Sequence, residues 1–203
     1  MKRLIATAAL ATLVASPAFA QSYQYNPNEG PYLGAGLGYS KLDNETLDWL
    51  GDIGASTDDS DTGYKLFVGY QFNPNFAVEA GYADFGDFSA SGADGTDSAR
   101  LKLGVEGFTA ALVGNLPIQN GFSVFGKLGM VAWDADLDLD ATIDGDVYRE
   151  SAGEDGTDPY YGIGAEYEVQ QIMMRAEYER YDISDSGEDF EIDLFSASLG
   201  YRF

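Results

Sequence analysis

Large apolar side chains recur at every second position along most of the chain from residue 32 to the C-terminus. The alternating segments are about 10 to 13 residues long, are rich in Tyr, Phe, Val and Gly, and are separated by polar connections. A period of two is the pattern of β-strands that have one apolar face. The sequence therefore predicts eight strands, at residues 32–42, 63–72, 76–85, 103–116, 122–133, 160–169, 172–183 and 192–203.

The connections between these segments alternate between short and long. Three are tight turns, at 73–75, 117–121 and 170–171, and four are longer and polar, at 43–62, 86–102, 134–159 and 184–191. Strands joined by tight turns are antiparallel. We therefore predict an all-β fold, an eight-stranded antiparallel up-and-down β-barrel with short turns at one end and long loops at the other. Because the strand number is even, both termini should lie at the turn end.

The phase of the alternation separates a membrane barrel from a soluble one. In the last segment the large apolar residues, among them Phe195, Leu199 and Tyr201, share one face, while the other face is small or charged. A soluble barrel of the lipocalin kind would have to bury such rings in a narrow interior and expose its glycines. We therefore expect a transmembrane β-barrel with lipid on the apolar face and with glycines and charges in the lumen. Rings near strand ends should form interfacial girdles, at Tyr39, Phe72, Phe76, Phe122, Tyr167, Tyr201 and Phe203.

The N-terminus has the features of a secretory signal peptide. Lys2 and Arg3 precede an apolar run at 4–14, and Ala18 and Ala20 supply the small residues that a signal peptidase reads. The alternative, a membrane anchor, would need about 20 apolar residues to span a bilayer. We expect cleavage after Ala20, so that residues 1–20 are the signal peptide and residues 21–203 form one outer-membrane β-barrel domain.

The composition excludes several kinds of chemistry. The sequence contains no cysteine and no histidine, which removes thiolate metal sites and the usual general base. The formal net charge of −23 disfavours binding to nucleic acid. We expect no catalytic residue, no metal site, no cofactor and no enzymatic activity. A hydrolase built on paired carboxylates is the alternative that the composition leaves open.

Charged residues recur on the inward phase of the predicted strands. The lumen of an eight-stranded barrel is just wide enough to be filled by side chains, and ions persist there only when they are paired. The near balance of four cations and five carboxylates predicts a salt-bridge network that plugs the barrel. The alternative is a gate, in which rearranged pairs open a narrow ion path. The predicted network consists of Lys65, Glu79, Lys127, Glu166, Glu168, Arg175, Glu177, Glu179 and Arg202.

Most of the acid, 27 of the 34 carboxylates, lies in or beside the four long connections. Oxygen ligands at this density could bind Ca²⁺ or Mg²⁺. However, residues 134–146 lack the spacing of an EF-hand, since the closing Glu would fall on Ser151. We favour a solvated acidic surface, suited to a salty habitat or to divalent bridging of lipopolysaccharide. The alternation of Asp with apolar residues at 134–140 also indicates a strand that continues above the membrane.

The signal peptide, the eight strands, the short turns and the terminal stretch 198–203 (Ser-Leu-Gly-Tyr-Arg-Phe) resemble a family of small outer-membrane barrels. This family includes the transmembrane domain of outer-membrane protein A and the opacity-type, porin-family surface proteins. Residues 122–129 are also similar to its fifth strand. The resemblance implies the bacterial outer membrane, with both termini periplasmic. It further implies that Leu199, Tyr201 and Phe203 form a signal for the barrel-assembly machinery; the alternative is that they only anchor the strand in lipid. We expect no peptidoglycan-binding domain to follow the barrel.

Two functions are therefore weighed. The first is a non-enzymatic protein that stabilises the outer membrane and displays long acidic surface loops for adhesion or interaction. The alternative is a small porin or narrow channel for ions or solutes, which needs a lumen open past Lys127 and Glu79. The expected partners are outer-membrane lipid and lipopolysaccharide, the barrel-assembly machinery, and divalent cations at the acidic loops.

Overall fold

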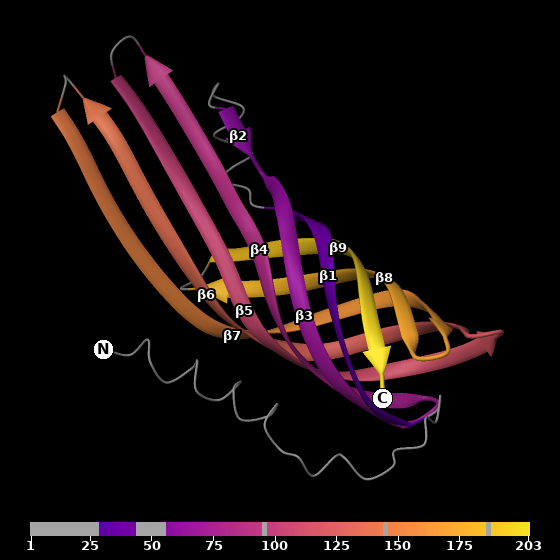
Figure 1. Ribbon diagram of the computed structural model, residues 1–203. Coiled ribbons are helices and arrows are strands. Elements are labelled where there is room, and N and C mark those ends of the chain that lie inside the picture. The colour runs from indigo at the N-terminus through magenta and orange to yellow at the C-terminus, as the bar shows by residue number, and fades with distance from the viewer. Residues whose placement is uncertain (1–28, 44–55, 95–96, 144–145, 186–187) are drawn as a thin grey trace.

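The computed structural model describes residues 29–43, 56–94, 97–143, 146–185 and 188–203, and almost all of them lie in β-strands (Figure 1). Each of the eight predicted segments overlaps one long strand. No helix in the described part of the chain is long and apolar enough to cross a membrane. The strands are β1 (Gly30–Asp43), β2 (Ser56–Asp58), β3 (Ser60–Asn73), β4 (Phe76–Asp94), β5 (Asp97–Gln119), β6 (Phe122–Ile143), β7 (Asp146–Val169), β8 (Ile172–Asp185) and β9 (Glu188–Arg202).

The eight long strands close into a ring. β1 pairs with both β3 and β9, and β4 pairs with β5, which completes the circuit. Every pairing is antiparallel, and neighbours in the ring follow the order of the chain. The predicted eight-stranded antiparallel up-and-down barrel is therefore confirmed. The short β2 lies beside the outer part of β4, where Thr57 pairs with Ala90.

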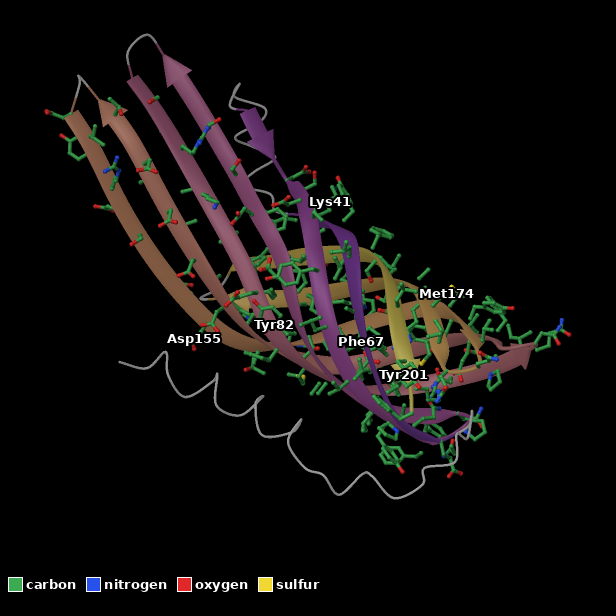
Figure 2. All side chains as sticks on the ribbon, in the orientation of Figure 1. Lys41, Phe67, Tyr82, Asp155, Met174 and Tyr201 are labelled. Carbon is green, nitrogen blue, oxygen red and sulfur yellow. The ribbon has the colours of Figure 1, made fainter. Side chains whose placement is uncertain are left out.

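The side chains alternate between the outside and the inside of the ring. Large apolar residues at outward positions expose up to 71% of their surface, as Leu128 does. Met174 and Tyr201 belong to this outer surface (Figure 2). All seven rings predicted for the girdles are also exposed. A closed barrel covered by exposed apolar side chains presents the surface that lipid solvates.

The tight turns lie at the end of the barrel where β1 begins and β9 ends. The side-chain oxygen of Asn73 accepts hydrogen bonds from the amides of Asn75 at 2.9 Å and Phe76 at 3.0 Å, which fixes the turn between β3 and β4. The turn between β5 and β6 is formed by Asn120 and Gly121, with φ of 54° and 80°. Asn followed by Gly is the pair that adopts this backbone most readily, so the local sequence sets the turn.

At the opposite end, β4, β5, β6 and β7 continue past the other strands as a four-stranded sheet (Figure 1). We call its residues 87–94, 97–104, 134–143 and 146–159 the projecting sheet; Asp155, labelled in Figure 2, lies on β7 where this sheet leaves the barrel. The prediction of loops at 86–102 and 134–159 is therefore wrong, because both segments are mostly β-hairpins. Asp has a low β-propensity, which obscured the strands. The expected continuation at 134–140 is confirmed, and β6 extends further, to Ile143.

A β-bulge in β4 marks the point where the projecting sheet begins. The register between β4 and β5 shifts between Asp84 and Asp87, and Gly86 has a φ of +80°, a conformation that strains a side chain. The Asp84 carboxylate accepts a hydrogen bond from the Gly86 amide at 2.9 Å, and Asp61 accepts one from the Asp87 amide at 2.8 Å. Because a bulge bends the strand that carries it, this one redirects β4 as it leaves the ring.

The barrel interior differs from the prediction in one respect. Glycines and charged groups do line it, but it also contains two clusters of buried apolar residues. The lower cluster, toward the turn end, consists of Tyr32, Phe67, Ala77, Val113, Phe125 and Met173. The upper cluster, toward the loop end, consists of Leu42, Ala83, Phe85, Phe88, Val105, Ala111, Val131, Trp133, Tyr160, Tyr181, Ile183, Ile192 and Leu194.

The upper cluster has a physical reason. Outward positions within the bilayer are apolar because lipid surrounds them, whereas outward positions beyond the bilayer face water and become polar. The loop-end part of each strand can then bury apolar residues only on its inward face. Trp133, for example, is 2% exposed, while its neighbours Ala132 and Asp134 point outward and are exposed. Assigning one apolar phase to a whole strand therefore missed the reversal of polarity at the rim.

Candidate functional site

The nine charged residues predicted for the lumen come from six strands and meet inside the barrel. Eight of them are at most 7% exposed, and the side chain of the ninth, Glu168, is 12% exposed. Ion pairs join all nine into one connected set, which we call the lumen network. The alternation places them there because each occupies an inward position of its strand.

The lysines hold the part of the network that includes Glu177 and Glu179 of β8. Lys65, on β3, contacts Glu179 at 2.6 Å and also pairs with Glu177. Lys127, on β6, shares both partners and adds a third, which lies on β4. Its Nζ lies near three carboxylate oxygens, Oε1 of Glu79 at 2.5 Å, Oε1 of Glu177 at 3.1 Å and Oε1 of Glu179 at 3.4 Å.

The arginines hold the part of the network nearer the turn end. Arg175 contacts Oε2 of Glu79 through Nη1 at 2.7 Å and Oε2 of Glu166 through Nε at 2.5 Å. Arg202 contacts Glu168 through Nε at 2.9 Å and Glu166 through Nη2 at 3.5 Å. Glu166 therefore connects the two arginines, and Glu79 connects the arginine part to Lys127.

Three aromatic rings of the lower cluster surround the Arg175 guanidinium. Its central carbon lies 4.9 Å from the ring centre of Phe67, 5.0 Å from that of Tyr32 and 5.2 Å from that of Phe125. Aromatic faces attract a cation, most strongly where water is excluded. The Tyr32 hydroxyl also donates a hydrogen bond to Glu79 at 3.1 Å. The faces of the three rings therefore position the arginine, and the hydroxyl of Tyr32 positions Glu79, one of the carboxylates that the arginine contacts.

Sequence reasoning missed these three rings because the inward phase was read for charge and glycine only. A usable signal existed in the glycines of the neighbouring strands. A side chain on any of three inward glycines would collide with a ring, Gly34 with Phe67, Gly69 with Tyr32 and Gly164 with Phe125. An inward aromatic residue beside an inward glycine on the next strand thus indicates a ring that lies flat across the lumen.

The upper cluster closes the lumen on the loop side of the network. The rings of Tyr160 and Tyr181 stack with centroids 4.8 Å apart, and Phe85 packs edge-on against Tyr181 at 4.6 Å. The Trp133 indole donates a hydrogen bond to Asp158 at 2.6 Å. Because the upper cluster lies on the loop side of the charges and rings of the lower cluster lie among them, the deeper ion pairs replace contacts with water.

On the turn side, a cavity of about 320 Å³ opens at the mouth of the barrel. Glu166, Glu168 and Arg202 of the network contribute to its wall, together with Gln71 and Asn115. The network thus borders an open vestibule on one side only. Its deeper members, including Lys127 and Arg175 at 3% and 5% exposure, are shielded from solvent.

The other predicted residues lie elsewhere. Leu199, Tyr201 and Phe203 all point outward at the turn end of β9 and are exposed by 64%, 36% and 45%. The rings of Tyr201 and Phe203 pack edge-on, with centroids 5.0 Å apart. Ala18 and Ala20 lie outside the described residues.

In the part of the acidic hairpins that the structure describes, the carboxylates form no compact cluster of ligands. Within the described ranges, no group of three or more carboxylates is arranged to hold a metal ion. Four Asp side chains instead form a row along the outer face of β6 and point away from the lumen. They are Asp134, Asp136, Asp138 and Asp140. Arg149 of β7 contacts Asp140 at 3.0 Å, so part of this row is neutralised within the sheet.

Comparisons with known proteins give one family and several similar folds. A family model for the outer membrane protein β-barrel domain matches residues 6–203. Ail, the attachment invasion locus protein of Yersinia pestis, is 20% identical with a TM-score of 0.53, over 86% of this chain and 99% of that one. OprG from Pseudomonas aeruginosa is 16% identical with a TM-score of 0.53, over 87% and 97%. Neisserial surface protein A is 12% identical with a TM-score of 0.54, over 86% and 97%. A comparison with curated proteins finds no match.

Proposed function

Because this chain belongs to the family of outer-membrane β-barrel domain proteins, and is therefore a bacterial outer-membrane protein, we propose that it is a non-enzymatic scaffold. In this proposal the barrel stabilises the outer membrane, the lumen network is a structural plug, and the acidic projecting sheet is displayed for adhesion or interaction. The observation that carries the proposal is the burial of the Lys127 and Glu79 pair at the level where a pore would have to pass.

The ion pairs support a plug over the porin alternative. A channel needs charged groups that water and ions can reach, whereas Lys127, Arg175 and Glu179 are each at most 5% exposed. Lys127 contacts Glu179, and Lys127 and Arg175 both contact Glu79. The upper cluster adds stacked rings above the network. Opening a path would require both layers to move, which would break several buried ion pairs at once.

The projecting sheet supports the display role. Apart from the bulge between Asp84 and Asp87, the strands of the projecting sheet keep their backbone pairing as they run on from the barrel, so the sheet can serve as a platform for its side chains. Residues 146–159 of β7, for instance, pair with β6 along their whole length. The acidic side chains are carried on this platform at fixed spacing, which suits recognition of a partner.

The remaining parts of the proposal concern topology and assembly. Residues 1–20 act as the signal peptide, with cleavage after Ala20, and both termini lie in the periplasm. The C-terminal residues Leu199, Tyr201 and Phe203 act as the signal for the barrel-assembly machinery. Lipopolysaccharide contacts the outside of the barrel near the rim. Binding of divalent cations by the acidic hairpins stays a prediction.

Conductance tests the plug. Purified protein in planar bilayers should give no sustained, large open-channel currents, and Lys127→Met should lower stability before it adds conductance. Steady currents from the unaltered protein would overturn the plug and favour the porin. For the display role, cells that carry a barrel lacking residues 134–159 should keep the protein in the outer membrane but lose binding to host cells or phage. Retained binding would contradict the role of the projecting sheet.

A further inference from the structure

The projecting sheet has two unlike faces. Its outer face carries the Asp row of β6 together with cations from the neighbouring strands, such as Lys102, which contacts Asp87 at 2.9 Å. Its inner face continues the inward phase of the barrel. In the described part of the sheet, no Lys or Arg lies on this inner phase.

Four leucines form an apolar block on the inner face. Leu101 pairs with Leu139, and Leu103 pairs with Leu137, so that two leucines of β5 lie directly opposite two of β6. Leu103 also packs partly against the upper cluster, which makes the block continuous with the barrel interior. The block is not fully buried, since Leu139 exposes 38% of its surface. Apolar surface presented beyond the membrane, where lipid does not cover it, is a feature of binding sites.

Two carboxylates border the leucine block on the β7 side. Glu150 pairs with Leu139 and Glu154 pairs with Ala135, so both side chains lie on the inner face. Both residues are exposed. They are separated by four residues, about 13 Å along a strand. The inner face therefore combines an apolar block with a negative border, and its described residues include no positive charge.

We propose that the inner face of the projecting sheet binds a cationic amphipathic helix from a peptide or partner protein. The leucine block would receive the apolar stripe of the helix, and Glu150 and Glu154 would pair with its Lys or Arg side chains. An apolar stripe at positions i, i+3, i+4 and i+7 is about 10 Å long, which is enough to cover the block, whose leucines lie about 7 Å apart along each strand. This inference deepens the proposed display role by naming the class of partner, and it rests on that role.

Charge decides between this occupant and others. A second copy of the chain carries a formal charge of −23 and would bring like charges together. Lipid phosphates would meet the carboxylates of Glu150 and Glu154. An uncharged apolar ligand would use the leucines but would be indifferent to the border. Only a cationic amphipathic partner satisfies both parts of the surface.

Binding of a synthetic peptide tests the proposal. The probe is a fluorescein-labelled helix of about 18 Leu and Lys residues arranged at the helical period, titrated with the protein in zwitterionic nanodiscs and corrected with empty nanodiscs. Fluorescence anisotropy should show saturable binding. A scrambled peptide of the same composition, which has no apolar stripe, should bind far more weakly. Equal binding of the two peptides would overturn the proposal.

Matched variants assign the face. Glu150→Gln combined with Glu154→Gln should weaken binding by about threefold or more at low salt, while Asp136→Asn with Asp138→Asn, which removes the same charge from the outer face, should change it little. Leu139→Thr should weaken binding about fivefold, and Val147→Thr, on the outer face of the same sheet, should not. An equal effect of inner-face and outer-face variants would contradict the assignment.

Two further outcomes would assign the inner face to a different binding partner. Binding that appears only in a variant lacking residues 44–55 would assign the face to that segment of the chain. Self-association that Leu139→Thr abolishes would assign it to a second copy. The peptide assay uses purified protein, so its failure alone leaves the display role standing, whereas loss of cell binding is measured separately on whole cells.

Discussion

Lys127 Nζ of β6 lies 2.5 Å from Glu79 Oε1 of β4, past the intervening β5, in side chains that are only 2% and 5% exposed. Neither group can exchange its partner for water without opening the barrel. Glu79 is also the carboxylate that connects Lys127 to Arg175. The pair therefore connects the lysine and arginine parts of the lumen network, as Glu177 also does through its contacts with Lys127 and Arg175.

Removing the Lys127 charge should destabilise the barrel, because its carboxylate partners stay buried. Lys127→Met leaves Glu79, Glu177 and Glu179 with too little positive charge, and we expect the free energy of unfolding to fall by about 3–5 kcal/mol. Urea unfolding in lipid vesicles, followed by tryptophan fluorescence, measures it. Lys102→Met is the control, because Lys102 forms an exposed pair with Asp87 and its loss should be barely measurable. Adding Glu79→Met to Lys127→Met should recover part of the loss; equal effects of the two lysine variants would contradict the plug.

Two glycines distinguish the inside of the barrel from the outside. A Cβ at Gly69 would overlap the ring of Tyr32, whereas a Cβ at Gly114 would meet nothing within 4 Å. We expect Gly69→Ala to destabilise the barrel by about 1–3 kcal/mol, because the ring must move within a packed lumen. Gly114→Ala should be neutral or slightly stabilising. The same unfolding assay compares them, and an unperturbed Gly69 variant would show that the ring of Tyr32 has room to move.

Acid should loosen the bulge where the projecting sheet begins. Hydrogen bonds from the amides of Asp87, at 2.8 Å, and Thr62, at 2.7 Å, lower the pKa of Asp61 below its usual value. A carboxyl whose folded pKa is lowered stabilises the fold above its unfolded pKa, and that contribution is lost as the pH falls through the folded pKa. We expect amide hydrogen exchange at Asp87 and Thr62 to accelerate below the ordinary pKa of Asp, after correction for intrinsic exchange. Asp61→Asn should remove this pH dependence; a profile unchanged by that substitution would show that another group is responsible.

Comparison of two exposed aromatic residues can distinguish an assembly signal from a lipid anchor. Phe203 and Phe122 are both exposed at the turn end, by 45% and 40%. If the C-terminal aromatic residue is read during assembly, Phe203→Ala should reduce the amount of folded protein in the outer membrane several-fold more than Phe122→Ala. Heat-modifiable mobility of membrane fractions on gels measures the folded amount. Equal losses would reduce Phe203 to an anchor.

The sequence was sufficient for the barrel because its rules are local. The period of two, the Asn73 and Asn120 turns and the outward rings each follow from neighbouring residues, and each lies where expected. The inward charges were also predictable, since an inward position is known once the phase is known. Their partners were not, because residues such as Lys65 of β3 and Glu179 of β8 are 114 residues apart in the chain and meet only because the pairing of β1 with β9 closes the ring.

The projecting sheet was harder to predict because its residues give conflicting signals. Asp has a low β-propensity, and residues 146–159 combine acidic residues, glycines and a proline in a stretch typical of a loop. Pairing with β6, which alternates regularly, overrides these preferences. The upper cluster was missed for a related reason, since Trp133 and Tyr181 lie inward beyond the level at which lipid sets the outer surface.

The open edge of β7 affects how copies of the protein associate, both before insertion into the membrane and when they are crowded within it. In the described structure residues 146–159 pair with β6 only, so one row of backbone amides and carbonyls is open. Such an edge is a template on which another copy can add a strand and begin an aggregate. Here the edge carries Glu150, Glu154 and Asp158, and Pro159 lacks an amide to donate. Two copies that joined edge to edge would bring carboxylates next to carboxylates. The repulsion between these charges therefore opposes aggregation through this strand.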